Sequence, residues 1–517
     1  MIHDVAIVGC GPVGATAANL LGRAGLSVLV LEREPDPHPL PRAVHIDHEM
    51  MRIFQGIGLI DRLLPLMRET DGHLHIGADG GAIRYLGTAG RARPFGWAND
   101  YFFYQPELEA NLRDALAAYP RVDLRLGAEL VGLVQQDDHV TLRLAEGGTA
   151  QARYVIACDG ARSSVRKALD LWLDDLDFEE PWLVVDAEVD GPIRFPPFTG
   201  VPGEADLQRL SVMLCDPRRP ATIVPGRGNH RRWEFMLLPG EDDREMMGPA
   251  QVAGLIGPWV DGAPHRLVRA ATYRFHGLVA FEWQAGRVFL AGDAAHQTPP
   301  FFGQGMCHGL RDVANLAWKL DLVLKGLAAP ALLETYQPER DPHVRAVIGA
   351  AVAAGRYICE LDPEKAAERD TEMRRRAAQP GATAADLIPP YRAGVVGAGG
   401  GQRFIQPMVT DAQGRRRLLD DVTGGGWVLL RGADAANATF PSALGVKTLN
   451  IGCDLLDDTG MLAAWFDRHG LGAGASILLR PDAYLFGIAA DDAALAALAD
   501  ELTAKLHLQP ERIACPA

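Results

Sequence analysis

The sequence has few cysteines and no motif that pairs them. Seven cysteines are scattered over 517 residues, at positions 10, 158, 215, 307, 359, 453 and 515, and none stands in a C-x-x-C motif. This pattern argues against a disulfide framework and a zinc site, and it favours reduced thiols in a cytoplasm. No H-E-x-x-H, His/Cys cluster or G-x-S-x-G nucleophile elbow stands out. We therefore expect neither a metal-dependent nor a serine-dependent mechanism.

Long apolar runs and an excess of basic residues are also lacking. No apolar run reaches the length of a membrane span, and the N-terminus enters a predicted strand without a signal-peptide pattern. The formal net charge of -15 argues against a nucleic-acid-binding protein, which normally carries a basic patch. The length and the 48% hydrophobic content fit two or three ordinary globular domains. We expect a cytoplasmic protein without membrane or nucleic-acid partners.

The N-terminal segment carries the motif around which the chain is organised. A run rich in β-branched residues, Val5 to Val8, leads into G-x-G-x-x-G at Gly9, Gly11 and Gly14, and a second strand ends at Glu32. These glycines allow a tight turn, a close approach of the backbone to a pyrophosphate, and close packing of the following helix. The helix N-terminus would bind the phosphates, and Glu32 would accept hydrogen bonds from ribose hydroxyls. The motif predicts a dinucleotide site without distinguishing FAD from NAD(P).

Titratable residues cluster shortly after this motif. A proline-rich loop delivers Arg42 to an amphipathic helix predicted over 45–58, whose first turn carries His45, Asp47 and His48. These side chains are candidates for a functional site. The alternative is that Asp47 only stabilises the helix dipole and that both histidines are exposed.

The middle of the chain alternates between two patterns. Short strands are predicted within 73–104 and again within 182–269, where β-branched and aromatic residues alternate with polar ones. Between and after these stretches, strands end in Asp159-Gly160 and in Gly292-Asp293. Each strand end of this kind presents a carboxylate beside a flexible turn.

The last part of the chain reads as a separate unit. The glycine-rich stretch 394–401 predicts a linker, and residues 402–517 alternate strands with helices. This predicts a small α/β domain. It carries no paired cysteines and no evident catalytic cluster.

Three motifs together resemble a known family. They are the N-terminal fingerprint, C-D-G-A-R-S (Cys158 to Ser163), and G-D-A-A-H (Gly292 to His296) followed by P-P-F-F-G-Q-G-M (Pro299 to Met306). This set resembles the single-component flavoprotein aromatic hydroxylases of the p-hydroxybenzoate and phenol hydroxylase type. The segments L-P-R-A-V-H-I-D-H-E (Leu40 to Glu49), F-Y-Q-P-E-L-E and G-Q-G-M-C-H-G-L-R-D-V-A-N-L-A-W-K-L are most similar to the 3-(3-hydroxyphenyl)propionate hydroxylases. The resemblance extends from Met1 to about residue 350.

The resemblance implies an α/β fold with three parts. A Rossmann-like FAD-binding domain would contain an inserted β-rich substrate domain, and a thioredoxin-like α/β domain without C-x-x-C would follow. The expected FAD-binding segments are 1–72, 105–181 and 270–392, the substrate sheet comes from 73–104 and 182–269, and the C-terminal domain is 402–517.

The resemblance also implies where FAD lies. Glu32 would bind the adenosine ribose, Arg42 and Gln105 the pyrophosphate and ribityl region, and Asp293 the ribityl chain. The turn before the helix at Met306 would offer its amides to the negative charge of the reduced flavin. The full set of expected cofactor-binding residues is Gly9, Gly11, Pro12, Val13, Gly14, Glu32, Arg33, Arg42, Ala43, Gln105, Val134, Asp159, Gly160, Gly292, Asp293, Pro300, Gly303, Gln304, Gly305 and Met306.

The implied reaction uses NADH or NADPH as co-substrate and O2 as oxidant. Reduced FAD would form a C4a-hydroperoxide that hydroxylates a phenolic ring, first of all 3-(3-hydroxyphenyl)propionate or a similar phenolic acid. A protein base that favours the phenolate would speed this attack. The catalytic candidates are His45, Asp47, His48, Tyr104 and Arg231, with His230, Arg232 and Tyr273 nearby in sequence or sheet.

Several alternatives stay open at this point. Arg231 and Arg232 point to opposite faces of a predicted strand, so at most one reaches the substrate. The alternative for each, which we favour, is an exposed surface arginine. Another phenol, resorcinol or a polyketide is an alternative substrate. A flavin oxidase or reductase without oxygen insertion, and a non-catalytic NAD-binding regulator, are the alternatives of other classes. A homodimer is kept as a candidate assembly.

Overall fold

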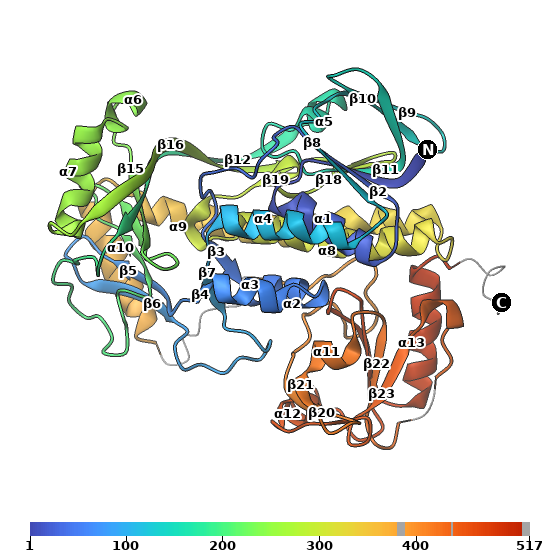
Figure 1. Ribbon diagram of the computed structural model, residues 1–517. Coiled ribbons are helices and arrows are strands. Elements are labelled where there is room, and N and C mark those ends of the chain that lie inside the picture. The colour runs from blue at the N-terminus through green and yellow to red at the C-terminus, as the bar shows by residue number, and fades with distance from the viewer. Residues whose placement is uncertain (380–387, 436–437, 509–517) are drawn as a thin grey trace.

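The computed structural model describes residues 1–379, 388–435 and 438–508. Figure 1 shows a central α/β region, a β-rich region at its left and a C-terminal region below it at the right. The six cysteines among the described residues are free, and the seventh, Cys515, lies outside them. Within the described residues, no helix combines the length and the apolar character that crossing a bilayer requires.

A mixed eight-stranded sheet forms the central region. Its order is β17-β18-β11-β1-β2-β8, with β10 added beside β11 and β9 beside β10. The run from β18 to β8 is parallel, and its core strands are apolar and buried on both faces, as parallel sheets require. The strands are β1 (Ile2–Val8), β2 (Val28–Glu32), β8 (Val122–Leu126), β9 (Leu130–Gln135), β10 (Val140–Leu144), β11 (Thr149–Ala157), β17 (Gln284–Ala285) and β18 (Val288–Leu290).

Helices cover this sheet. Helix α1 packs between α4 and α8, and all three run beneath the sheet in Figure 1. Small residues on α1, such as Ala15 and Ala18, are fully buried and let the helix approach closely. The helices are α1 (Pro12–Arg23), α2 (His48–Gly56), α3 (Ile60–Leu63), α4 (Gln105–Ala115), α5 (Ser164–Ala168), α8 (Gly305–Leu324), α9 (Tyr336–Ile358) and α10 (Pro363–Ala377).

A second eight-stranded sheet forms the β-rich region. Its order is β19-β16-β12-β15-β14-β13-β5-β6, so segments from both predicted insertions meet through the parallel pair β13 and β5. Helices α6 (Asp243–Met246) and α7 (Pro249–Val260) belong to this region, and apolar residues of α7 pack on one face of the sheet. The strands are β5 (Gly72–Ile76), β6 (Ala82–Gly87), β12 (Leu173–Val189), β13 (Ser211–Leu214), β14 (Ala221–Val224), β15 (His230–Met236), β16 (His265–Ala280) and β19 (His296–Gln297).

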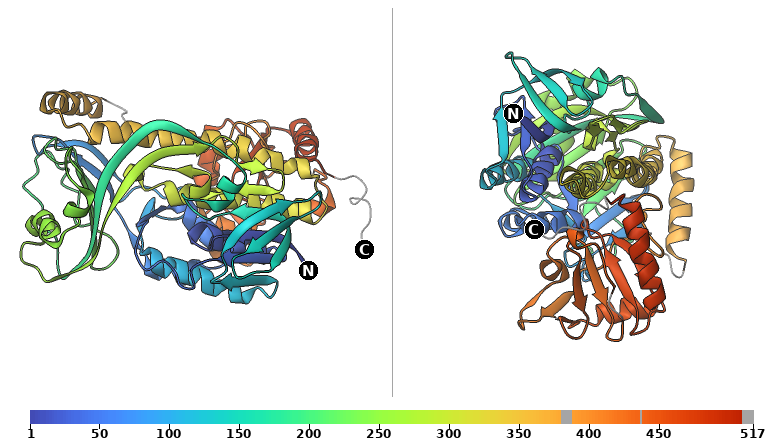
Figure 2. Two further views of the ribbon diagram at one scale, coloured as in Figure 1. Left: turned by 90° about the horizontal axis from the view of Figure 1, so that it is seen from above. Right: turned by 90° about the vertical axis from the view of Figure 1, so that its right-hand side faces the viewer.

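Two long strands join the β-rich region to the central one. The antiparallel strands β12 and β16 run from one region to the other without interruption, which Figure 2 shows from above. The predicted boundaries at 181/182 and 269/270 fall inside these strands. The two regions are therefore linked by continuous hydrogen-bonded backbone at these points.

One predicted helix begins later than expected. Residues His45–Asp47 form strand β3, which pairs with β7 (Asp100–Phe102), and β7 also pairs with β4 (Arg68–Glu69). Helix α2 starts only at His48, because the side chain of Asp47 accepts a hydrogen bond from the Glu49 amide and caps the helix.

The C-terminal region is an α/β domain with the thioredoxin-like strand order β23-β22-β25-β26 and a smaller sheet β21-β20-β24. The stretch 394–401 is not a free linker, because the amides of Gly397 and Gly401 donate to the carbonyls of Phe486 and Leu485. The elements are β20 (Met408–Asp411), β21 (Arg416–Leu418), α11 (Leu419–Thr423), β22 (Val428–Arg431), β23 (Lys447–Asn450), β24 (Leu455–Leu456), α12 (Met461–Arg468), β25 (Ser476–Leu479), β26 (Leu485–Ala489) and α13 (Asp492–Lys505).

Buried polar contacts hold this domain against the centre of the molecule. The guanidinium of Arg480 lies 2.7 Å from the carboxylate of Glu339, and both side chains are fully buried. The hydroxyl of Tyr484 donates to Glu49 over 2.9 Å. Because an unpaired buried charge is costly, these pairs fix how the C-terminal domain sits on helices α2 and α9.

Candidate active site

A cavity of about 380 Å³ lies where the N-terminal glycine turn meets the β-rich sheet. Segments far apart in sequence line it, as is usual for a cofactor and substrate site. Of the predicted cofactor-binding residues, twelve line it: Gly11, Pro12, Val13, Arg42, Ala43, Gln105, Gly160, Asp293, Pro300, Gly303, Gly305 and Met306.

The glycine turn has the geometry that a dinucleotide requires. Gly9 has φ of +94°, and a Cβ there would lie 2.5 Å from the Cys158 carbonyl oxygen. A Cβ at Gly14 would lie 1.9 Å from the Gly9 oxygen, whereas one at Gly11 would meet no atom within 4 Å. The first and third glycines therefore allow close packing, and the second faces open space at the N-terminus of α1. No side chain caps this helix end, so its amides are available to an anion.

Two polar side chains fix the loops beside this turn. Glu32 accepts hydrogen bonds from the amides of Cys10 at 2.6 Å and Glu34 at 2.9 Å. The Oε1 of Gln105 accepts from the amides of Arg42 and Ala43 at 3.1 and 2.7 Å. The acid at the end of β2 thus lies beside the glycine turn, and Gln105 holds the loop that carries Arg42 at the cavity.

The opposite wall is made by a strand end and a helix start. Asp293 lines the cavity and is exposed to it. No hydrogen bond to Asp293 is formed within the described residues. The turn from Gly303, with φ of +64°, leads into α8, whose first amides have no side-chain cap. A ligand with hydroxyl groups and a negative pole fits this pair of features.

These features fit FAD. The uncapped N-terminus of α1 and the open space at Gly11 match the pyrophosphate. The carboxylate of Asp293, which has no hydrogen-bond partner within the described residues, matches the ribityl hydroxyls. The fit rests on the chain's own geometry.

The remaining predicted cofactor residues do not line the cavity. Glu32 lies at the strand end described above, Gly9 and Gly292 lie in turns with positive φ, and Gly14 lies in the first turns of α1. The carboxylate of Asp159 accepts from the Val165 amide at 3.1 Å, towards α5. Gln304 directs its side chain to Arg311 instead. Arg33 is exposed, and Val134 is 51% exposed on β9, so the structure does not bring these two to the cavity.

A buried histidine–aspartate pair lies beside the flavin turn. The Nε2 of His45 is 2.7 Å from Asp100, and its Nδ1 is 3.5 Å from the Gly303 carbonyl. Burial opposes charge on His45, but the hydrogen bond and charge of Asp100 outweigh it and raise the pKa of His45. His73 lies close by, and the polar atoms of His45, His73 and Asp100 are all within 4.8 Å of one another. Burial lowers the pKa of His73 to about 4, so His73, which lines the same cavity as His45, is neutral.

Asp47 and His48 lie away from the cavity in a second buried network. Arg311 donates to Asp47, to Glu49 over 2.7 Å and to Gln304 over 2.9 Å. Burial would raise the pKa of Asp47, but the Arg311 guanidinium outweighs it and holds that pKa well below its usual range. Burial lowers the pKa of His48 to about 4. These groups support the turn before α8 rather than line the cavity.

The predicted arginine is replaced by its neighbour. Arg232 lines the cavity, whereas Arg231 is turned away and donates to the carbonyls of Pro225 and Gly228 at 2.8 Å. The alternation of side chains along β15 is the reason. Tyr104 also lies outside the lining, with its ring 5.7 Å from that of His230.

Sequence reasoning missed several residues that line the cavity or contact its lining. Asp100 and Glu234 were not singled out, because isolated acids in short strands carry no motif. A signal existed for His73, since His73 and His75 alternate with apolar residues along one strand. Arg269 was missed as well, although it lines the cavity beside Tyr273.

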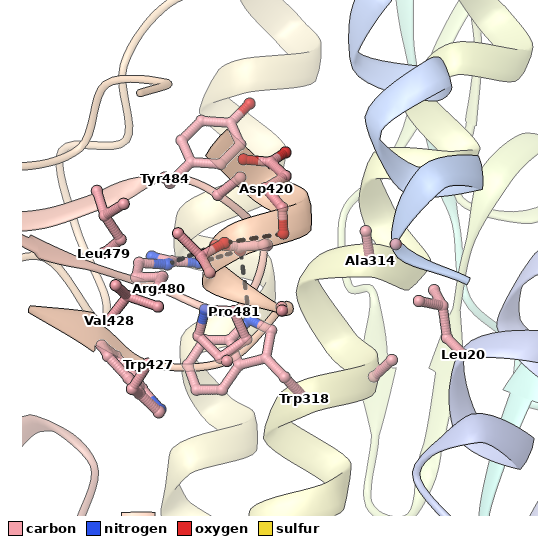
Figure 3. A pocket seen from close by; sticks show the side chains of 18 of the residues that line it. Leu20, Ala314, Trp318, Asp420, Trp427, Val428, Leu479, Arg480, Pro481 and Tyr484 are labelled. Atoms are coloured by element: carbon pink, nitrogen blue, oxygen red, sulfur yellow. Dashed lines mark hydrogen bonds and ion pairs between the residues drawn. The ribbon is translucent and has the colours of Figure 1, made fainter. Parts of the chain in front are cut away.

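A second cavity, of about 710 Å³, lies between the C-terminal domain and helices α1, α2 and α8. In Figure 3, Leu20 and Ala314 face Trp427, Val428 and Arg480 across it. Glycines line this cavity too, at Gly424 to Gly426, but they follow the end of α11 instead of leading into a helix N-terminus. The features that fit a dinucleotide are those of the first cavity.

Comparisons with known proteins agree with this geometry. Residues 3–351 match the family model described as FAD binding domain, and residues 401–505 match the HcaD C-terminal domain. A 3-(3-hydroxy-phenyl)propionate/3-hydroxycinnamic acid hydroxylase of Burkholderia vietnamiensis is 37% identical and covers 97% of each chain. A probable NADH-specific resorcinol 4-hydroxylase of Rhodococcus jostii is 36% identical over 99% of this chain and 97% of its own. Aklavinone-11 hydroxylase, solved with FAD and aklavinone, has a TM-score of 0.79 at 26% identity over 98% of this chain and 99% of its own.

Proposed function

This chain belongs to the FAD-binding-domain family and is an FAD-dependent aromatic monooxygenase; we propose that its substrate is a single-ring phenol with a substituent at the meta position. The names of two relatives supply substrates of this kind, 3-(3-hydroxyphenyl)propionate and resorcinol. Both are phenols substituted at ring position 3. The phenolic acid is the first candidate and resorcinol the second.

In this proposal, FAD is held between the glycine turn and the start of α8. Gly11 and the free amides of α1 would bind the pyrophosphate, Asp293 would accept hydrogen bonds from the ribityl hydroxyls, and the amides from Gly303 to Met306 would stabilise negative charge on the flavin. When bound, FAD supplies the redox chemistry with NADH or NADPH and O2. The protein contributes binding, orientation and exclusion of water.

The observation that carries the proposal is the His45–Asp100 pair beside the Gly303 turn. Asp100 accepts from Nε2 of His45 at 2.7 Å, which fixes the ring and leaves Nδ1 on the side of Gly303. From that position Nδ1 takes the phenol proton, so that the ring carries the electron density that oxygen transfer requires. The neutral His73 stands beside this pair, and its buried Nδ1 has no hydrogen-bond partner within the described residues.

The β-rich sheet closes the other side of the cavity. Val184, Val224, Met213 and Phe275 line it with apolar surface, which keeps water away from the reacting ring. Loss of this exclusion would release reduced oxygen as peroxide without hydroxylating a substrate.

The test measures product and peroxide together. Purified FAD-loaded enzyme is given NADH or NADPH with each candidate phenol, and NAD(P)H oxidation, hydroxylated product by mass and peroxide are quantified. A product that gains one oxygen in near-equal amount to the NAD(P)H consumed supports the proposal. Oxidation that yields only peroxide with every meta-substituted phenol contradicts it.

The cellular location is also part of the proposal. A cytoplasmic location fits an enzyme that depends on NAD(P)H and carries free cysteines. The homodimer and the absence of a nucleic-acid partner stay predictions.

A further inference from the structure

Polar side chains stand in a row on the cavity face of the β-rich sheet. Glu234 on β15 lies opposite Thr222 on β14, and Ser211 on β13 lies beside His73 on β5. All four residues line the cavity. The alternate residues Trp233 and Phe235 pack on the other face, so the register directs Glu234 inward.

Three of these side chains have no hydrogen-bond partner within the described residues. Glu234, Thr222 and Ser211 are at least nine-tenths buried, yet their side-chain oxygens take part in no hydrogen bond within the described residues. The cation nearest to Glu234 is Arg232, whose Nη1 is 3.8 Å away, beyond hydrogen-bond range. Burial raises the pKa of Glu234, and Arg232 offsets this only in part. Buried polar groups are normally hydrogen-bonded, so these three await a ligand.

The two arginines that the β-rich sheet contributes to the cavity, Arg232 and Arg269, already have partners. The fully buried Asp186 accepts from Nε of Arg232 at 2.8 Å and from Nε of Arg269 at 2.9 Å. Arg232 also donates to the carbonyls of Pro41 and Arg42, and Arg269 donates to the Tyr273 hydroxyl at 2.9 Å. A substrate carboxylate could recruit either guanidinium only at the expense of Asp186, which would leave a buried charge poorly paired.

The charges on this side of the cavity determine which substrate substituent can bind there. On the β-rich sheet, the guanidinium groups of Arg232 and Arg269 face two carboxylates, Asp186 and Glu234, so this side of the cavity has no surplus positive charge. A substrate carboxylate beside Glu234 would bring like charges together in a site with little water. A hydroxyl group, in contrast, donates to Glu234 and accepts from Thr222 or Ser211.

We infer that Glu234, with Thr222 and Ser211, binds a second hydroxyl group of the substrate and selects an uncharged dihydric phenol over a phenol with a carboxylate side chain. This inference rests on the proposed function, and it reverses the order of the two candidate substrates. Glu234 is the specificity-determining residue. The His45–Asp100 pair acts on the first hydroxyl in either case.

The test separates charge from size. The wild-type enzyme and the Glu234→Gln variant are compared with resorcinol, 3-(3-hydroxyphenyl)propionate and the uncharged amide of that acid. Product formation gives kcat/KM, and quenching of flavin fluorescence gives Kd. Glu188→Gln, on β12 of the same sheet but outside the cavity lining, is the matched control.

The expected results are specific. Wild type favours resorcinol over the acid, and the amide over the acid, each by about tenfold or more in kcat/KM and in Kd. In Glu234→Gln, both preferences fall to within about threefold, chiefly because kcat/KM for the acid rises and its Kd falls. Thr222→Val keeps the β-branched shape and should weaken the binding of resorcinol alone. It tests the same hydroxyl subsite if Glu234→Gln does not fold.

Two results would overturn the inference. A wild type that binds and hydroxylates the acid better than its amide removes the role of Glu234 while leaving the proposed function intact. If a folded Glu234→Gln protein prefers resorcinol and the amide over the acid as strongly as wild type does, Glu234 likewise has no role in selectivity, and the proposed function stands. A wild type that hydroxylates none of the three compounds overturns both proposals together.

Discussion

Replacing Asp100 with asparagine should weaken the base and shift its pH dependence. Asp100 lies 2.7 Å from His45, and both side chains are buried, so the bond is charge-assisted. A charge-assisted hydrogen bond contributes about 1.5–3 kcal/mol and a neutral one about 1 kcal/mol. The difference of about 0.5–2 kcal/mol corresponds to a fall of about one unit in the pKa of His45.

The direction of the shift follows from the sign of the charge. Asp100 raises the pKa of His45, so Asp100→Asn keeps the imidazole neutral to lower pH and makes it a weaker base. The acid limb of the kcat/KM profile should move down by about one pH unit, and the plateau should fall about tenfold or more. The assay follows hydroxylated product, not NAD(P)H oxidation, from pH 5 to 9.

A matched control is present on the surface. Asp138 lies 2.7 Å from His139 in the same kind of pair, but its side chain is 82% exposed. Asp138→Asn should leave the pH profile of kcat/KM unchanged. If the profile of Asp100→Asn superimposes on that of wild type, the assignment of the base to His45 is refuted.

Three further predictions concern cofactor binding and stability. Glu339→Gln should lower the free energy of unfolding by about 3–5 kcal/mol in urea, because it removes the buried negative charge that pairs with both Arg480 and Lys319. Asp293→Asn should raise the FAD dissociation constant by about tenfold, measured by flavin fluorescence, because a carboxylate accepts hydroxyl hydrogen bonds more strongly than an amide. Tyr484→Phe should speed proteolysis of the C-terminal domain, because Glu49 loses a buried hydrogen bond worth about 1 kcal/mol.

Each of these predictions has a control and a contrary result. Glu334→Gln changes an exposed acid close to Glu339 in sequence and should leave the urea midpoint unchanged. An unchanged midpoint in Glu339→Gln itself would contradict the stability argument. Wild-type FAD affinity in Asp293→Asn, or wild-type proteolysis in Tyr484→Phe, would contradict the other two.

The nucleotide-binding half of the site could be predicted from the sequence because its signals are local. The spacing of Gly9, Gly11 and Gly14 between two apolar strands specifies a turn and a helix start within one short segment. Asp293 and the turn at Gly303 follow the same logic, since each lies at the end of one strand or the start of one helix. Local rules therefore place these residues without knowledge of distant contacts.

The substrate half could not be predicted because strand pairing over long distances creates it. Asp100 reaches His45 only because β3 pairs with β7, and His73 reaches Ser211 only because β5 pairs with β13. The choice of Arg231 over Arg232 failed for a related reason. The alternation of side chains along a strand places Arg231 and Arg232 on opposite faces of the sheet. Only the pairing of β15 with β12 and β14 determines which of these faces lines the cavity.

The central claim is that this chain inserts an oxygen atom from O2 into a phenolic ring. The most direct measurement supplies ¹⁸O2 to the FAD-loaded enzyme with NADH and resorcinol or 3-(3-hydroxyphenyl)propionate, and determines the product mass. We predict a product that carries one ¹⁸O atom, formed in near-equal amount to the NADH consumed. A product without ¹⁸O, or NADH oxidation that yields labelled peroxide alone, would contradict the claim.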